Sequence, residues 1–265
     1  MKRIIGILTC ALALLFVLAG AAHAKEVSSV KLEHKFKPGE SVGYVLTVDS
    51  DSMFTLYGLE KKIIQKVVTT FNMTENSQPG SKNVLAFILD ILEERITSEG
   101  ESVDSPARGS KINLKLSREG KVMDSSDPAK LQYFQDMIVS FPEKAVGKGE
   151  EWNSETPFKI KNNDGTESEF KAVLSCKIED FKLYAEKQCA VIATKLVISD
   201  SGNKSSLLKA GAEGRMYFDY ENGKIIASDN LINMNMKVMD ENSKTRKTVE
   251  ASTLRSKITV KLTLK

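Results

Sequence analysis

Apolar and polar residues alternate along most of this chain, which is the pattern of β-strands that bury one face. The alternation is clearest at 42–48, 112–116 and 254–264. In the last stretch, the face opposite the apolar one carries threonine, lysine and arginine, as expected for an antiparallel sheet with one face in water. Turn signals separate the strands: Tyr57-Gly58, Asn163-Asp164-Gly165 and Asn222-Gly223.

The stretch 83–96 fits two structures. Its apolar residues fall on both faces of a strand, and the segment LAFILDILEERI also suits a helix. Strands in the middle of a sheet can be apolar on both faces when both are covered. We predict a central strand, because the corresponding stretch of the second half, Cys189–Ser199, is rich in valine and isoleucine.

A helical period occurs in the middle of the chain, at 127–141. Asp127 can cap a helix that begins at Pro128, and Pro142 ends it. Its apolar residues share one face: Leu131, Phe134, Ile138 and Phe141. Such a stripe usually packs on a sheet, and the alternative is a surface for a lipid or a partner protein.

The chain also contains an internal repeat. Two pairs of motifs match: Pro38-Gly39-Glu40 with Lys148-Gly149-Glu150, and Glu119-Gly120-Lys121-Val122 with Asn222-Gly223-Lys224-Ile225. Their separation exceeds the period of solenoid repeats. We therefore predict a mainly β protein with two related antiparallel β halves, 25–126 and 147–265, which form curved sheets, a half-barrel or a sandwich. The amphipathic helix, within 127–146, lies between them.

The N-terminus has the features of a secretory signal peptide at 1–24. Lys2 and Arg3 precede an apolar run, and Ala22-His23-Ala24 fits a cleavage site. We expect an exported protein, periplasmic or extracellular, whose mature chain begins at Lys25. We expect no transmembrane segment after cleavage, because no other stretch is apolar and long enough.

The charge balance argues against nucleic acid as a partner. Subtracting Lys2 and Arg3 from the 38 basic residues leaves 36, against 35 acidic residues. Nucleic-acid binding calls for a basic face or stripe. With 41% hydrophobic and 28% charged residues, the composition is that of a globular protein.

Two cysteines remain after cleavage, Cys176 and Cys189. An even number of cysteines in an exported chain suggests a disulfide. The alternation, however, places Cys176 on the core face of its strand and Cys189 on the opposite face of the next one. A β-bulge would reconcile the two, so a bridge and a pair of free thiols both stay open.

The sequence contains few residues that could serve as catalytic groups. His34 is the one histidine outside the signal, and it lies within a predicted strand, so a catalytic triad would depend on it. No histidine or cysteine cluster has zinc spacing. We expect a protein that is not an enzyme and has no cofactor and no metal site.

Met234 and Met236 share one strand face with Ile232 and Val238. Thioethers suit a core, the lining of a cavity for apolar ligands, or, as soft ligands, copper(I). Core packing is the commonest of these roles. If an apolar-ligand site exists, we expect the helix stripe and this strand to line it: Leu131, Phe134, Ile138, Phe141, Met234 and Met236.

The segment Pro142–Trp152, PEKAVGKGEEW, resembles the signature of an uncharacterised family of exported bacterial proteins. In that signature a proline, a short apolar stretch, Gly-Asp or Gly-Glu and a tryptophan lie between two β-rich halves. The resemblance implies a two-repeat β fold and carries no activity or catalytic residues. The expected architecture is also similar to the curved half-barrels of periplasmic lipoprotein carriers, and a likeness of fold does not decide function.

Two functions are consistent with these features. The first is an exported envelope protein that binds an apolar ligand or a lipid between sheet and helix. The second is a structural or protein-interaction module that contacts other envelope proteins through the threonine and lysine face of 254–264.

Overall fold

A computed structural model describes residues 27–77, 83–127, 139–161, 167–200, 206–242 and 247–265. Within these ranges the chain forms fourteen β-strands and no helix. In chain order the strands are β1 (Ser29–Val30), β2 (Ser41–Leu56), β3 (Leu59–Glu75), β4 (Val84–Ser98), β5 (Glu101–Asp104), β6 (Lys111–Ser117), β7 (Val122–Ser125), β8 (Val146–Gly147), β9 (Glu151–Lys161), β10 (Glu167–Tyr184), β11 (Lys187–Asp200), β12 (Ser206–Asp219), β13 (Lys224–Asn242) and β14 (Lys247–Leu264).

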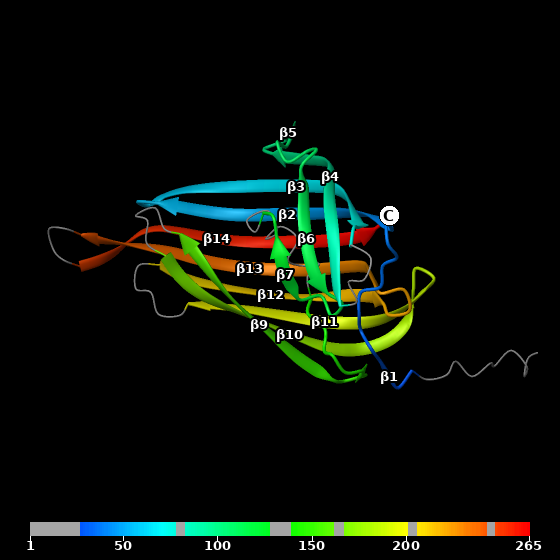
Figure 1. The fold of residues 1–265 in the computed structure, drawn as a ribbon. Helices are drawn as coiled ribbons and strands as arrows, with labels where there is room; N and C mark the ends of the chain where they lie inside the picture. The colour runs from blue at the N-terminus through cyan, green and yellow to red at the C-terminus, as the bar shows by residue number, and fades with distance from the viewer. Residues whose placement is uncertain (1–26, 78–82, 128–138, 162–166, 201–205, 243–246) are drawn as a thin grey trace, which may run out of the picture.

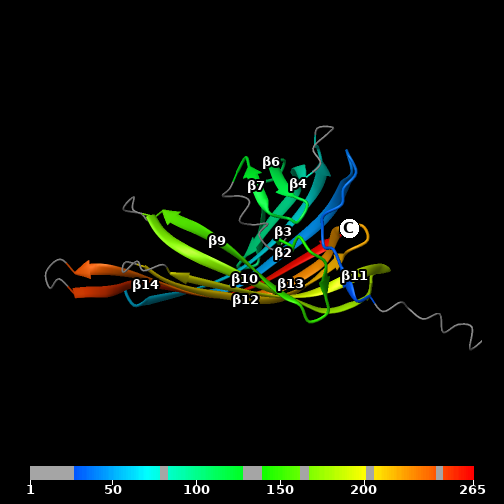
Figure 2. The same ribbon diagram turned by 60° about the horizontal axis from the view of Figure 1, so that its bottom comes forward.

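Twelve of the strands form a single antiparallel sheet, in the order β7-β6-β4-β3-β2-β14-β13-β12-β11-β10-β9, with β5 beside β4 off this path. The remaining two, β1 and β8, pair with each other. Figures 1 and 2 show the large sheet as a strongly curved, open layer, from which β4, β6 and β7 rise over the long C-terminal strands. The prediction of a mainly β, antiparallel fold is confirmed.

The strand order contains two series of five strands, one on each side of β14. The first series is β7-β6-β4-β3-β2 and the second is β13-β12-β11-β10-β9, and β14 lies between them, bonded to β13 and β2. The long pairing of β14 with β2, from Ser252↔Leu56 to Leu264↔Tyr44, makes one sheet of both series.

The two glycine-glutamate motifs form equivalent turns. Gly39 has φ 77° and Gly149 has φ 85°, values that favour glycine. The Gly39 N–H donates to Glu75 O (3.2 Å) and the Glu75 N–H to Glu40 O (2.9 Å). In the same way, the Gly149 N–H donates to Ile178 O (2.8 Å) and the Ile178 N–H to Glu150 O (3.0 Å). Each turn therefore docks on the strand after next.

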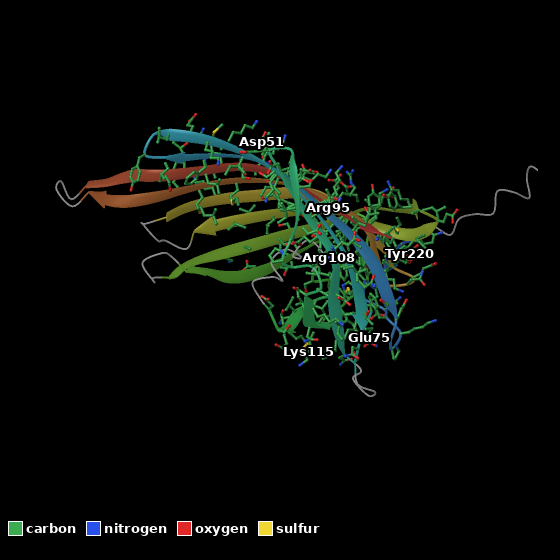
Figure 3. All side chains as sticks on the ribbon, turned by 90° about the horizontal axis from the view of Figure 1, so that it is seen from above. Asp51, Glu75, Arg95, Arg108, Lys115 and Tyr220 are labelled. Carbon is green, nitrogen blue, oxygen red and sulfur yellow. The ribbon has the colours of Figure 1, made fainter. Side chains whose placement is uncertain are left out.

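The buried core lies at one end of the long strands. There, alternate residues of neighbouring strands, including the upright strands β4 and β6, pack together in one cluster and are almost completely buried. They include Tyr44, Leu46, Phe71, Phe87, Leu89, Ile112, Leu114, Ile178, Ile192, Met216, Phe218 and Leu262. In Figure 3 the side chains crowd where the upright strands cross the sheet, and the labelled Glu75 lies at this end, away from Asp51 on the long arm of β2.

The segments around His34 and Phe141 cover this core, and they are hydrogen-bonded to the turns at Gly120-Lys121 and Gly223-Lys224. The His34 N–H donates to Arg118 O (2.7 Å) and the Lys35 N–H to Gly223 O (3.3 Å). The Phe141 N–H donates to Glu119 O (2.6 Å). The Trp152 indole also donates to Ser140 O (2.8 Å), so the 139–141 segment is bound from two sides.

The ambiguous 83–96 stretch is the strand β4, as predicted, with β3 on one side and β6 on the other. One of its faces is buried: Leu85, Phe87, Leu89 and Ile91. A β-bulge opposite Thr70/Phe71 then shifts the register, and Leu92 is left exposed.

The predicted helix at 127–141 is not supported. Residues 128–138 lie outside the described residues, and the described ends, Asp127 and 139–141, are not helical. The backbone reason at the C-terminal end is that the Phe141 N–H bonds to Glu119 O rather than to a carbonyl one turn earlier. The predicted signal at 1–24 and the turn Asn163-Asp164-Gly165 also lie outside the described residues.

Candidate ligand-binding face

The core face of the sheet continues along the strands beyond the core. Residues paired across antiparallel strands point to the same side, so the register defines which side chains share this face. We call its part outside the core the inner apolar face. Its residues form three rows across the strands: Leu174, Leu196, Ala212, Ile232 and Ile258; then Ala172, Ile198, Ala210 and Met234; then Leu208, Met236, Leu254 and Phe54.

The side chains of the inner apolar face are less buried than those of the core. Most are half-buried, and Leu208 and Ala212, at 5% and 8% exposed, are the buried exceptions. Core residues on the same strands, such as Met216 and Leu262, are 1% exposed. The same strands therefore pass from a closed core to an apolar surface that is only partly covered by described residues.

The outer face of these strands has the opposite chemistry. It carries cross-strand ion pairs between neighbouring strands: Lys62–Asp51 (3.0 Å), Lys66–Asp49 (3.9 Å), Lys261–Asp229 (3.8 Å), Lys195–Glu213 (3.6 Å), Lys177–Glu151 (2.8 Å) and Lys171–Glu155 (2.7 Å). Their side chains are half exposed or more, as expected for a solvated face. The sheet is thus amphipathic, with the charges on its outer side.

A polar group separates the core from the inner apolar face. Asn230 of β13 reaches across Gly214, where a side chain would collide with it, and accepts a hydrogen bond from the Thr194 hydroxyl (3.0 Å). Its amide donates to the Ser228 hydroxyl (2.9 Å). Asn230 is buried, and these bonds satisfy its polar atoms inside an apolar surrounding.

Hydroxyl groups lie at the β14–β2 side of the face. Ser52 and Ser256 hydrogen-bond to each other (2.7 Å), and the Ser50 hydroxyl donates to Gln65 O (3.3 Å). Because a hydroxyl both donates and accepts, the Ser52–Ser256 pair retains capacity for a further hydrogen bond. The face therefore combines a broad apolar area with a small polar site at its side.

The structure separates the residues that the sequence grouped as lining. Met234 and Met236 lie on the inner apolar face and are half-buried. Phe141 is 4% exposed and belongs to the core, where its ring lies 5.5 Å from the His34 ring. Leu131, Phe134 and Ile138 lie outside the described residues. Sequence reasoning missed Phe54, Leu196 and Leu254, although each continues the alternation of its strand.

Comparisons with known proteins give no family. No family model and no curated protein matches this chain. Among solved structures, DynF from the dynemicin biosynthesis pathway of Micromonospora chersina is 9% identical, over 92% of this chain and 90% of that one, with a TM-score of 0.21. P47 from Clostridium botulinum A2 is 10% identical, over 79% and 80% of the two chains, with a TM-score of 0.19.

Neither cysteine forms a disulfide. Cys176 and Cys189 are both free and buried. Cys176 pairs with Thr194 of β11, the strand that also holds Cys189 five residues earlier, so the two lie about 17 Å apart along the strand direction. A disulfide needs Cα atoms within about 7 Å. The bridge suggested by the even count is therefore not formed.

The thiols and the histidine are not arranged for nucleophilic catalysis. Burial raises the pKa of Cys176 to about 12, and burial, followed by the Asp219 carboxylate, raises that of Cys189 to about 11. Both thiols stay protonated at neutral pH, and the thiolate is the nucleophilic form. Burial lowers the pKa of His34 to about 4, against a smaller opposing effect of its hydrogen bond to the Gly223 backbone.

His34 is enclosed by aromatic rings rather than by reactive groups. Its ring lies 5.5 Å from that of Phe141 and 5.7 Å from that of Phe218, and its Nε2 atom is buried with no hydrogen-bond partner. Among the described residues, no group of three or more histidine, cysteine or acidic side chains is placed to hold a metal ion. In the same part of the chain, no helix has the length and apolar character to cross a membrane.

Proposed function

We propose that this protein binds an apolar ligand, such as the acyl chain of a lipid, on the inner apolar face, and that it acts as a binding protein rather than as an enzyme. One observation carries the proposal. The face is apolar across β10 to β14 and β2, yet most of its side chains are only half-buried, whereas the same strands are fully buried at the core. Large apolar surfaces that stay accessible mark binding sites.

The chemistry of the face favours an extended apolar molecule. Its widest rows hold leucine, isoleucine and methionine, and flexible methionines adapt to ligands of varied shape. Covering on the order of 300 Å² of apolar surface would contribute about 7 kcal/mol before the cost of ordering the ligand. The Ser52–Ser256 hydroxyls would accommodate a polar end group of the ligand.

Titration with Nile red, a neutral apolar dye, tests the proposal. We expect the wild-type protein to raise the dye's fluorescence with saturable binding. Met234→Glu and Leu196→Glu place a charge on the inner apolar face and should weaken binding at least about tenfold, because an unpaired carboxylate is costly in an apolar site.

Asn233→Glu and Val197→Glu are the matched controls. They carry the same new charge on the same two strands, one residue away and therefore on the outer face, where both side chains are exposed. Their dye affinity should equal that of the wild type. Absence of saturable binding by the wild type, or an equal loss in the control variants, would show that the inner apolar face is not a binding site.

We also infer that the two halves of the chain are related copies. The order β7-β6-β4-β3-β2 corresponds to β13-β12-β11-β10-β9, and the turns at Gly39 and Gly149 make the same hydrogen bonds. In this interpretation β14 is an added strand that joins the copies and widens the inner face. Both copies contribute to the site, since Phe54 comes from the first and Met236 from the second.

A further inference from the structure

The β2–β3 hairpin ends in an apolar tip. Leu56 pairs with Leu59 across the turn Tyr57-Gly58, and the three large side chains are 43%, 76% and 78% exposed for Leu56, Tyr57 and Leu59 respectively. Figure 1 shows this hairpin at the end of the sheet opposite the C-terminus, beside the β13–β14 hairpin, which extends farther in the same direction. These three residues are called the hairpin tip below.

Two other tight hairpins in the protein show that the fold does not require an apolar tip. The β4–β5 hairpin turns at Glu99-Gly100 and the β10–β11 hairpin at Ala185-Glu186, with the same left-handed backbone. Their turn residues are polar, charged or small. The turn at the hairpin tip has this same backbone, with Tyr57 at φ 46°, but its exposed side chains are large and apolar. The turn does not require exposed apolar side chains, so their presence indicates a role outside folding.

The hairpin tip is continuous with the inner apolar face. Leu56 lies on the same side of β2 as Phe54, because they are two residues apart on one strand. Phe54 pairs with Leu254, which pairs with Met236 on the next strand. An unbroken apolar path therefore leads from the tip to the third row of the inner apolar face.

We propose that the hairpin tip inserts into the surface of a lipid bilayer, and that a ligand passes between the bilayer and the inner apolar face along this path. The inference rests on the proposed function for the path, while the insertion itself is measured separately. Tyrosine is suited to the membrane interface, since its ring is apolar and its hydroxyl polar, and leucines on either side suit the acyl region.

A bilayer fits the hairpin tip better than a protein partner does. A stable protein interface buries about 800 Å² on each partner. Three side chains on a narrow apex offer on the order of half that area. The nearby charges are of both signs, with Glu60 and Asp51 against Lys61, Lys62 and Arg255, so insertion depends mainly on apolar contact rather than on anionic lipid.

Co-sedimentation with vesicles tests the inference. The full chain is mixed with phosphatidylcholine vesicles, and separately with vesicles that also contain phosphatidylglycerol. We expect partition into both, with less than about a twofold difference between them. The double variant Tyr57→Ser/Leu59→Ser should partition at least about tenfold less, because it removes most of the inserting apolar surface.

Leu183→Ser is the matched control. Leu183 is 64% exposed and lies beside another tight hairpin turn, so it is a comparable apolar surface residue outside the hairpin tip. The control should partition like the wild type, and all variants should keep the wild-type circular dichroism spectrum and melting temperature. Equal partition of the tip variant and the wild type, no partition by either, or an equal loss in Leu183→Ser would overturn the inference.

Nile red binding without vesicles separates this inference from the proposed function. A tip variant that binds the dye normally but loses vesicle binding supports insertion at the tip. A wild-type protein that partitions into vesicles through the tip but does not bind the dye also supports insertion, and it overturns the proposed function and the ligand path. Normal dye binding with no vesicle binding overturns insertion and leaves the proposed function standing.

Discussion

At one end of the sheet, β12 and β13 contribute Met216, Phe218 and Ile225, none more than 3% exposed, whereas further along the same strands Met234 and Met236 are only half-buried. Both sets lie on the same side of the sheet and both are apolar. The difference in burial comes from which segments pack against each stretch of this face. The upright strands and the segment around His34 cover the core end, and their hydrogen bonds to Arg118 and Gly223 hold that cover in place.

Alternation along a strand therefore predicts which residues share a face, but it does not predict whether that face is buried. An apolar face becomes core where a second layer covers it and a binding surface where it remains accessible. In this protein a covered stretch and a partly accessible stretch of one apolar face occur along single strands. Substitutions at the two ends should therefore differ in kind, affecting stability at the core end and ligand binding at the other.

The largest effect is expected from removing a phenyl ring at the core end. Phe218→Ala should lower the free energy of unfolding by about 3–5 kcal/mol, because the ring is 0% exposed and its loss leaves a cavity. Phe54→Ala, on the inner apolar face, should cost about 1 kcal/mol and weaken Nile red binding. Urea denaturation and dye titration measure the two. Equal losses of stability would mean that the two ends are packed alike.

Acid should destabilise the core end through His34. Its pKa is about 4 in the folded protein and 6.5 in the unfolded chain, so the unfolded chain binds a proton that the folded protein does not accept. Stability therefore falls as the pH drops from about 6.5 to about 4, by about 3 kcal/mol, and this contribution then stays constant. Urea denaturation at several pH values measures the decrease.

His34→Gln is the control for that decrease. Glutamine does not titrate, so the variant should lose less stability than the wild type between pH 7 and pH 4, and the difference isolates the histidine from the carboxylates. The described side chains of the inner apolar face include no histidine or carboxylate. Nile red affinity should therefore stay constant while the protein remains folded, and an identical pH dependence of both variants would contradict the assignment to His34.

Gly223 and Gly58 both have a left-handed backbone, but their surroundings differ. Gly223 has φ 66°, and a Cβ there would lie 2.3 Å from Lys35 N and 2.5 Å from Glu33 O. Gly223→Ala should cost about 2–3 kcal/mol, since backbone must move as well as adopt a strained φ. Gly58 has φ 83° with nothing within 4 Å of its Cβ position. Gly58→Ala should cost about 1 kcal/mol, and thermal unfolding distinguishes the two.

The alternation of apolar and polar residues predicted much of the fold, because it depends only on residues that are close together along the chain. It identified the faces of β2, β6 and β14, and it placed Met234 and Met236 on one side of a strand. The central position of β4 was predicted from the valine and isoleucine of the corresponding stretch Cys189–Ser199, because its own apolar residues also suit a helix. The motifs at Gly39 and Gly149, which match in sequence, form turns with corresponding hydrogen bonds.

What the sequence could not predict depends on pairing between distant strands. Phe54 joins the inner apolar face only because β2 pairs with β14, about two hundred residues later, in the register that sets it opposite Leu254. The position of Phe141 is a similar case. Its place in a helical period suggested a stripe on a helix, whereas the Glu119 carbonyl and the rings of His34 and Phe218 hold it in the core. Tertiary contacts outweigh local period in such short segments.

The smallest effect is expected on the outer face. Lys62 and Asp51 form an ion pair at 3.0 Å, with side chains 52% and 56% exposed, so water screens their attraction. Lys62→Met should change the free energy of unfolding by less than about 0.5 kcal/mol and leave Nile red affinity unchanged. A loss above about 1 kcal/mol in urea denaturation would mean that the cross-strand ion pairs of the outer face contribute substantially to the stability of the sheet. The near-neutral result is expected because the backbone pairing of β2 with both β3 and β14 persists when one solvated pair is removed.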